Sequence, residues 1–325
     1  MHTTTHELLD EIRGIITARA RPDMRTSVDG LLLSKVETAA QDYSLTEPLL
    51  VVMAQGAKRL LLGDQVYEYR AGECLVVTAE LPVTGHFLGA GPQLPALGIG
   101  LVLRPTAIAS LLLEVPPEVP AVRRSRTTAG PPAIATGEAG TELLDAMARM
   151  LRLLDRPADA HVLAPLIERE ILWRLLTGPH GGMVRQIGMA DSGLSHVSRA
   201  IRWIRDNYAE PMRIEDLARL AGMSSSAFHR HFRAVTAMSP LQFQKRIRLQ
   251  EARSLLIARP GDVAGVGHRV GYDSPSQFNR EYRRLFGAPP GHDTRPRAAA
   301  APEDIRHEIR HEVRHEVPHE IRHLP

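Results

Sequence analysis

Two stretches in the C-terminal third of the chain carry side chains that can hydrogen-bond to the edges of DNA bases. Arginine pairs well with guanine, asparagine and glutamine pair with adenine, and serine can hold backbone phosphates. The first set consists of Ser225, Ser226, His229, Arg230 and Arg233, and the second set of Ser276, Gln277, Asn279, Arg280 and Arg283. We predict that these ten residues contact DNA.

Aromatic residues at helical spacing lie between the polar residues of both sets. Phe228 and Phe232 are four residues apart, as are Phe278 and Tyr282. Residues at this spacing share one face of a helix, so the polar residues are left on the other face. Each stretch is therefore predicted to form a helix with a buried aromatic face and an exposed polar face.

A short helix and a glycine turn precede each of these predicted helices. In the first unit, Ile214, Leu217 and Ala218 mark a helix that ends at Gly222, and Ser224 is a good N-cap for the helix that follows. Gly271 takes the place of Gly222 in the second unit. Both units thus have the pattern of a helix-turn-helix, whose second helix enters the major groove of DNA. One such unit would be weak evidence, but two in one chain are much stronger.

The segment between the two units has the length that neighbouring major grooves require. Ser239-Pro240 is a helix start, and the apolar pattern continues to Ala258. A helix of about 20 residues is roughly 30 Å long. Successive major-groove faces on one side of DNA lie ~34 Å apart.

Positive charge is concentrated in the same part of the chain. Counting Lys+Arg minus Asp+Glu gives 18 − 22 = −4 for residues 1–194, 18 − 9 = +9 for residues 195–297 and 4 − 6 = −2 for residues 298–325. A basic segment of this size favours a polyanionic partner such as double-stranded promoter DNA.

The N-terminal half has the pattern of a small antiparallel barrel or sandwich. A leading helix is predicted over residues 5–20, and a helix over residues 106–114. Between them, short apolar runs alternate with turn residues such as Gly63-Asp64. The predicted strands are Leu31–Leu33, Leu49–Ala54, Arg59–Leu62, Val66–Tyr69, Cys74–Thr78 and Leu97–Leu103.

The remaining segments divide the chain into domains. Residues 115–136 are rich in proline and small residues and are predicted to be a connector, and helices are expected at 142–154 and 162–176. The fold class is therefore α+β. The predicted domains are 1–178 (barrel with helices), 179–195 (flexible linker), 196–297 (all-α module with two helix-turn-helix units) and 298–325 (low-complexity tail).

Nothing in the sequence favours a metal centre, a cofactor or an enzyme. Only His86 lies between Leu31 and Leu103, and one histidine cannot build a three-histidine site. Cys74 is expected to be a buried core residue. The tail repeats histidine with period four, which could chelate a metal on a helix, but its low complexity and Pro318 favour no functional site.

The composition bears on location. No apolar run reaches ~18 residues, and the N-terminus has no secretory signal pattern. The single cysteine excludes an intrachain disulfide. We therefore expect a cytoplasmic protein without a membrane partner.

The C-terminal module resembles the AraC/XylS family of bacterial transcription regulators over about residues 197–290. The matching segments are Leu217 to Ser224, Ser239-Pro240, Arg248-Leu249 with Ala252, Leu255 and Leu256, Val270 to Tyr282, and Phe286-Gly287 with Pro290. By position, the resemblance places base contacts on Ser226, His229 and Arg230, then on Ser276, Gln277 and Arg280. The chain departs from the family pattern at Val263–Gly267, where two interior glycines cost ~1 kcal/mol each and predict a looser second unit.

The N-terminal half is similar to the cupin-like arm that one branch of this family carries. The matching features are residues 48–56, 63–69, 71–73 and 81–83. The resemblance implies a transcription regulator, an activator that contacts RNA polymerase, whose barrel binds a small effector or forms a homodimer. Two alternatives remain open: a constitutive DNA-binding protein whose barrel only dimerises, and a cupin enzyme fused to a DNA-binding module.

Overall fold

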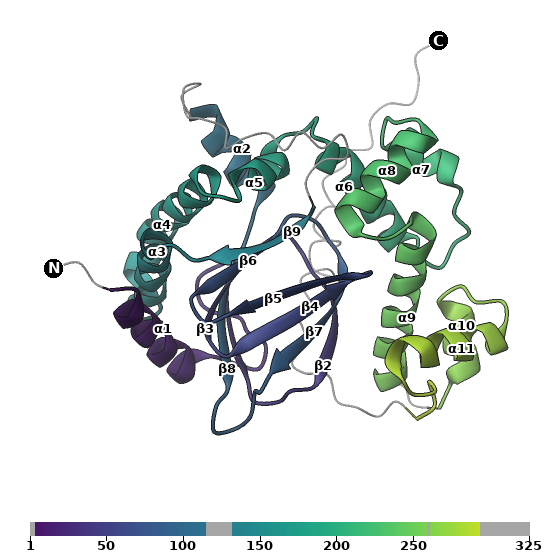
Figure 1. Cartoon of the computed structure of the whole chain (residues 1–325), viewed down its shortest axis with the longest axis horizontal. Helices are drawn as coiled ribbons and strands as arrows, with labels where there is room; N and C mark the ends of the chain where they lie inside the picture. The colour runs from purple at the N-terminus through teal and green to yellow at the C-terminus, as the bar shows by residue number, and fades with distance from the viewer. Residues whose placement is uncertain (1–3, 115–131, 259–260, 293–325) are drawn as a thin grey trace, which may run out of the picture.

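Short apolar strands and amphipathic helices occupy separate halves of the chain in the computed structural model, which describes residues 4–114, 132–258 and 261–292. The strands form a β-domain with helices on one side, and the last six helices form a module on its other side (Figure 1). The helices are α1 (Thr5–Arg19), α2 (Pro105–Glu114), α3 (Thr141–Arg152), α4 (Pro157–Thr177), α5 (Gly181–Gly188), α6 (Gly193–Asp206), α7 (Ile214–Leu220), α8 (Ser225–Thr236), α9 (Pro240–Ala258), α10 (Val263–Arg269) and α11 (Pro275–Phe286).

The strands pair antiparallel in two sheets, which confirms the predicted small antiparallel barrel and the α+β class. The strands are β1 (Leu31–Val36), β2 (Gln41–Leu45), β3 (Leu49–Gln55), β4 (Ala57–Leu62), β5 (Gln65–Arg70), β6 (Glu73–Val77), β7 (Pro82–Leu88), β8 (Ala96–Val102) and β9 (Ile134–Glu138). One sheet has the order β1-β8-β3-β6-β9 and the other the order β2-β7-β4-β5.

Alternation along the strands divides the β-domain into an outer and an inner layer of side chains. On β3, Leu50 and Val52 pack against α1 and the helices behind it, whereas Met53 faces the space between the two sheets. Helices α1, α3 and α4 cover the outer face of the five-stranded sheet (Figure 1).

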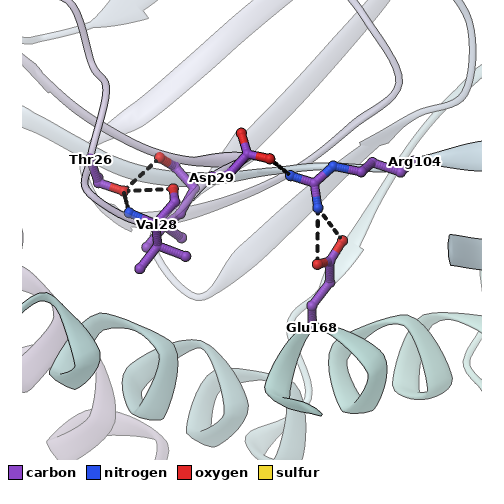
Figure 2. Close-up of polar contacts among 6 residues, drawn as sticks. Thr26, Val28, Asp29, Arg104 and Glu168 are labelled. Atoms are coloured by element: carbon purple, nitrogen blue, oxygen red, sulfur yellow. Dashed lines mark hydrogen bonds and ion pairs between the residues drawn. The ribbon is translucent and has the colours of Figure 1, made fainter. Parts of the chain in front are cut away.

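A buried arginine ties this helical layer to the barrel (Figure 2). Arg104 Nη1 donates to both carboxylate oxygens of Glu168 on α4 at 3.0 Å, and its Nη2 donates to Asp29 at 2.6 Å. Burial, only partly offset by Arg104, raises the pKa of Glu168. These contacts fix α4 against the turn that precedes β1.

Two predicted loops contain regular structure. The connector predicted over residues 115–136 is wrong at its end, because β9 begins at Ile134 and pairs with β6. The segment 179–195, predicted to be flexible, contains α5, which packs on α2 and α4. Close approach forms this helix: a Cβ on Gly188 would lie 2.8 Å from the backbone nitrogen of Ala109.

Two further predictions meet the limits of the structure. The histidine-rich tail, residues 298–325, lies outside the described residues. Among the helices in the described part of the chain, none is both long and apolar enough to cross a membrane.

Candidate DNA-binding surface

The first unit has the local geometry that its turn residues predict. Gly222 takes φ +64°, a left-handed conformation that ends α7 without a Cβ clash. The Ser224 hydroxyl then accepts a hydrogen bond from the backbone nitrogen of Ala227 at 3.3 Å, which caps α8. Helix α8 therefore starts at a fixed residue and leaves α7 at a fixed angle.

Aromatic packing sets which face of α8 points outward. Phe228 and Phe232 are fully buried, and the ring of Phe232 meets that of Phe243 on α9 edge-on at 5.4 Å. All five predicted residues of this unit are exposed on the opposite side of α8: Ser225, Ser226, His229, Arg230 and Arg233.

The second unit repeats this geometry. Gly271 takes φ +89°, and the Ser274 hydroxyl caps α11 by accepting from the Gln277 nitrogen at 3.3 Å. Phe278 and Tyr282 face inward with ring centroids 5.6 Å apart. The five predicted residues on the other side are again exposed: Ser276, Gln277, Asn279, Arg280 and Arg283.

The outer side of α11 borders an open hollow of about 850 Å³. Asn279, Arg280 and Arg283 line it, together with two residues that we did not predict, Arg284 and His292. Arg284 follows Arg283 directly, so counting every arginine of the helix that lies off the aromatic face would have identified it. The cationic lining suits a phosphate backbone.

The two glycines of α10 have packing roles, which changes the interpretation of a looser second unit. A Cβ on Gly267 would lie 3.0 Å from the ring of Phe278, so the missing side chain lets α11 approach α10 closely. A Cβ on Gly265 would lie 2.4 Å from the Asp262 carboxylate, which caps α10 by accepting from the Gly265 nitrogen at 2.9 Å. The cost in helix propensity is thus offset by contacts that only glycine allows.

Arg248 on α9 holds the two units together, a role that its sequence position did not reveal. Its Nε donates to the Tyr208 carbonyl at 2.6 Å and its Nη1 to the Gly271 carbonyl at 2.6 Å. Burial lowers the pKa of Arg248. One side chain therefore links the segment after α6, the connecting helix and the turn of the second unit.

The barrel contacts the two units to different extents. The first unit shares one continuous core with the barrel, which includes Leu62 and Leu81 on one side and Ile204 and Phe232 on the other. Arg205 also forms an ion pair with Glu80. The second unit has a separate core, against which Tyr43 of β2 packs, its ring 4.8 Å from that of Phe286.

Sites for other chemistry have little support in the described residues. Cys74 is buried, and burial raises the pKa of its thiol to about 11, as expected of a core residue. His86, predicted to be exposed or hydrogen-bonded, has a buried Nδ1 without a partner, which corrects that interpretation. Across the described residues, no three His, Cys, Asp or Glu side chains are grouped so that they could hold a metal ion.

Comparison with known families matches both halves of the chain. Residues 27–183 match the AraC-type transcriptional regulator N-terminus, and residues 217–295 match a helix-turn-helix domain. The chain is 24% identical over 151 residues to the HTH-type transcriptional activator RhaS of Salmonella typhimurium, which is 46% of this chain and 53% of RhaS. It is 23% identical over 149 residues to the uncharacterized HTH-type transcriptional regulator YdeC of Bacillus subtilis, 46% of this chain and 50% of YdeC. The chain thus spans about half the length of the curated relatives it matches.

Solved structures share the whole architecture. Apo ToxT from Vibrio cholerae covers 82% of this chain, and 97% of ToxT is covered, with a TM-score of 0.53 and 8% identity. ToxT solved with an unsaturated fatty acid covers 82% of this chain, and 95% of ToxT is covered, with a TM-score of 0.53 and 9% identity. At this identity the likeness shows the fold alone. With both family models matched in their expected order, the chain belongs to the AraC/XylS family of transcription regulators and combines an N-terminal arm domain with a helix-turn-helix module.

Proposed function

We propose that the whole chain is a sequence-specific transcription regulator that binds double-stranded promoter DNA through α8 and α11. One observation carries the proposal: both aromatic faces are buried, while all ten predicted contact residues are exposed on the outer faces. Arg230 and Arg280 are the strongest candidates for reading guanine, and Arg284 with His292 extends the phosphate-binding side of the second unit.

The connecting helix supports simultaneous contact with two major grooves. Helix α9 has 19 residues and is therefore roughly 28 Å long. The α7–α8 pair lies at one end of α9 and the α10–α11 pair at the other (Figure 1). This separation is close to the ~34 Å between successive major-groove faces, so both units can read one side of a single duplex.

Control by a small effector in the barrel is supported by the way two strands serve both domains. On β7, Gly85 faces the space between the sheets, whereas Thr84 accepts a hydrogen bond from Arg246 Nη2 of α9 at 3.1 Å. On β2, Tyr43 contacts α11. A ligand that moves these strands would shift the DNA-binding module. ToxT has been solved with an unsaturated fatty acid bound.

Dimerisation and recruitment of RNA polymerase are further parts of the proposal. Helix α4 exposes Val162, Leu163 and Leu166, the last at 60%, on a helix whose other side is buried in the core. This stripe favours a homodimer, and it would equally serve a constitutive regulator whose barrel only dimerises. RhaS is a transcriptional activator, and activation by this chain would require contact with RNA polymerase at a promoter in the cytoplasm.

Selection of bound sites from a random duplex library tests the proposal. The purified chain should enrich one motif with two half-sites about one helical turn apart. Arg230→Ala and Arg280→Ala should each lower affinity for the selected duplex by ~1–3 kcal/mol and relax base preference in one half-site only. Arg174→Ala, an exposed arginine on α4, is the matched control and should leave binding unchanged.

Enrichment of no motif would refute sequence-specific binding. Equal loss of preference in both half-sites for either variant would refute the assignment of one half-site to each unit. Repeating the measurement across salt concentrations separates phosphate contacts from base contacts, because only phosphate contacts change the slope.

A further inference from the structure

A lysine lies on the inner face of the barrel in a chain that otherwise uses arginine. The sequence has three lysines, Lys35, Lys58 and Lys245, among its 40 basic residues. On β4, Lys58 lies on the same face as Leu60 and Leu62, which are buried inside the barrel. Lys58 is opposite Tyr69 on β5 and opposite Phe87 on β7. The three side chains form one cross-strand row across the inner face.

The Lys58 ammonium has no anionic partner of its own. Its Nζ lies 4.4 Å above the centre of the Phe87 ring, and among residues 4–114, 132–258 and 261–292 it forms no ion pair or hydrogen bond. Burial lowers the pKa of Lys58, an effect that the charge of Asp42 on β2 partly offsets. A buried cation without a bonded anion is costly unless another group completes the site.

The residues around Lys58 keep space open beside it. Gly85 is next to Lys58 on the inner face, and a Cβ there would lie 2.7 Å from Lys58 Cε. Across the barrel, β8 contributes Gly98 and Gly100 to the inner face. The apolar inner residues Leu32, Leu49 and Val51 are half-buried rather than sealed in the core. One side of the inner face is therefore apolar and accessible, and the other side offers a cation.

We propose that the barrel binds a small carboxylate with an apolar body, whose carboxylate pairs with Lys58 and accepts a hydrogen bond from the Tyr69 hydroxyl. The ring of Phe87 and the apolar residues of β1 and β3 enclose the body of the ligand. This inference rests on the proposed function, because it assigns the chemical class of the effector. Asp42 and Tyr43 are neighbours on β2, so pairing of Lys58 with a ligand acts on the strand that contacts α11.

Binding of known carboxylates to the full chain tests this site without DNA. Benzoate, phenylacetate and octanoate are titrated into the wild type by calorimetry, with benzamide as the uncharged match of benzoate. We expect binding of at least one carboxylate and at least tenfold weaker binding by Lys58→Met, because a charge-assisted hydrogen bond is lost. Lys35→Met and Lys245→Met remove lysines outside the barrel and should bind like the wild type. Tyr69→Phe should weaken binding less than Lys58→Met.

A spectroscopic readout identifies the lysine directly. Methylation with ¹³C-formaldehyde labels the three lysines, and the variants assign their NMR signals. A bound carboxylate should raise the pKa of Lys58 and leave those of Lys35 and Lys245 unchanged. Equal carboxylate affinity in Lys58→Met and wild type, equal binding of benzamide and benzoate, or no binding of any of the three carboxylates would overturn the proposal. The affinity of the free protein for its selected duplex, measured in parallel, tests the proposed function separately.

Discussion

The two helix-turn-helix units have the same local design but different attachments to the rest of the molecule. In both, a positive-φ glycine ends the first helix and a serine caps the second. The core of the first unit merges with the core of the barrel, whereas the second unit packs around its own aromatic cluster and meets the barrel at Tyr43. The first unit must therefore move with the barrel, and the second can change position at a smaller cost.

This difference locates regulation more reliably than helix propensity does. The glycines of α10 suggest a weak helix, yet both have packing reasons. What distinguishes the second unit is the small area it shares with the barrel. A signal from the barrel would reach the second unit through Tyr43 and through α9, while the first unit stays in place on DNA.

The largest expected effect separates the two cores. Phe232→Ala should destabilise the protein by about 3–5 kcal/mol and shift the unfolding of barrel and first unit together, because the ring lies in their shared core. Tyr282→Ala should cause a loss of similar size that is confined to the second unit. Hydrogen exchange during urea titration would follow each region separately.

Exposure of α10 and α11 alone in Phe232→Ala, or of the barrel in Tyr282→Ala, would contradict this division of cores.

The next effect concerns the packing of α10. Gly267→Ala should destabilise the second unit by about 1 kcal/mol, because the methyl group meets the Phe278 ring and overpacking outweighs the gain in helix propensity. Gly14→Ala in α1 is the matched control. No atom lies within 4 Å of a Cβ at Gly14, so this change should stabilise by about 0.5–1 kcal/mol. Thermal unfolding of both variants decides the sign, and a stabilising Gly267→Ala would show that the second unit is loosely packed.

A smaller effect is expected where the second unit meets the barrel. Tyr43→Leu removes the edge contact with Phe286, worth about 0.5–1.5 kcal/mol. Hydrogen exchange in α11 should become faster, while exchange in α8 should stay unchanged. Equal acceleration in both helices would mean that the barrel holds both units through one interface.

The smallest effect is a pH dependence confined to the second unit. Burial raises the pKa of Glu281, but hydrogen bonds from Lys245, Tyr272 and Gln277 outweigh it and lower the pKa overall. A lowered pKa in the folded state contributes stability above the unfolded value of 4.5, and this contribution is lost as pH falls through the folded pKa. Glu281→Gln should therefore reduce the loss of stability below pH 4.5, measured by thermal unfolding. An unchanged pH profile would contradict this role.

Local patterns predicted the DNA-binding module well and the barrel less completely. The aromatic pairs Phe228/Phe232 and Phe278/Tyr282 settled both recognition helices, because spacing along one helix determines which face is buried. Strand β7 was missed because Pro82, Gly85 and His86 interrupt its apolar run. Such a strand is stabilised by its neighbours β2 and β4, which lie far away in sequence.

The positions that depend on long-range packing could not be predicted. Lys58 looks like a surface residue in its sequence context, and only the pairing of β4 with β7 places it inside the barrel. Arg248 follows a family motif, but its carbonyl partners come from segments about 40 and 23 residues away. Helix α5 forms where glycines allow contact with α2.

Hydroxyl-radical footprinting on the selected duplex tests most directly whether both units bind DNA. The wild type should protect two patches on one side of the duplex, separated by about one helical turn. Arg230→Ala should weaken one patch and Arg280→Ala the other, with the second more sensitive to Tyr43→Leu. A single protected patch that weakens equally in both arginine variants would contradict the account.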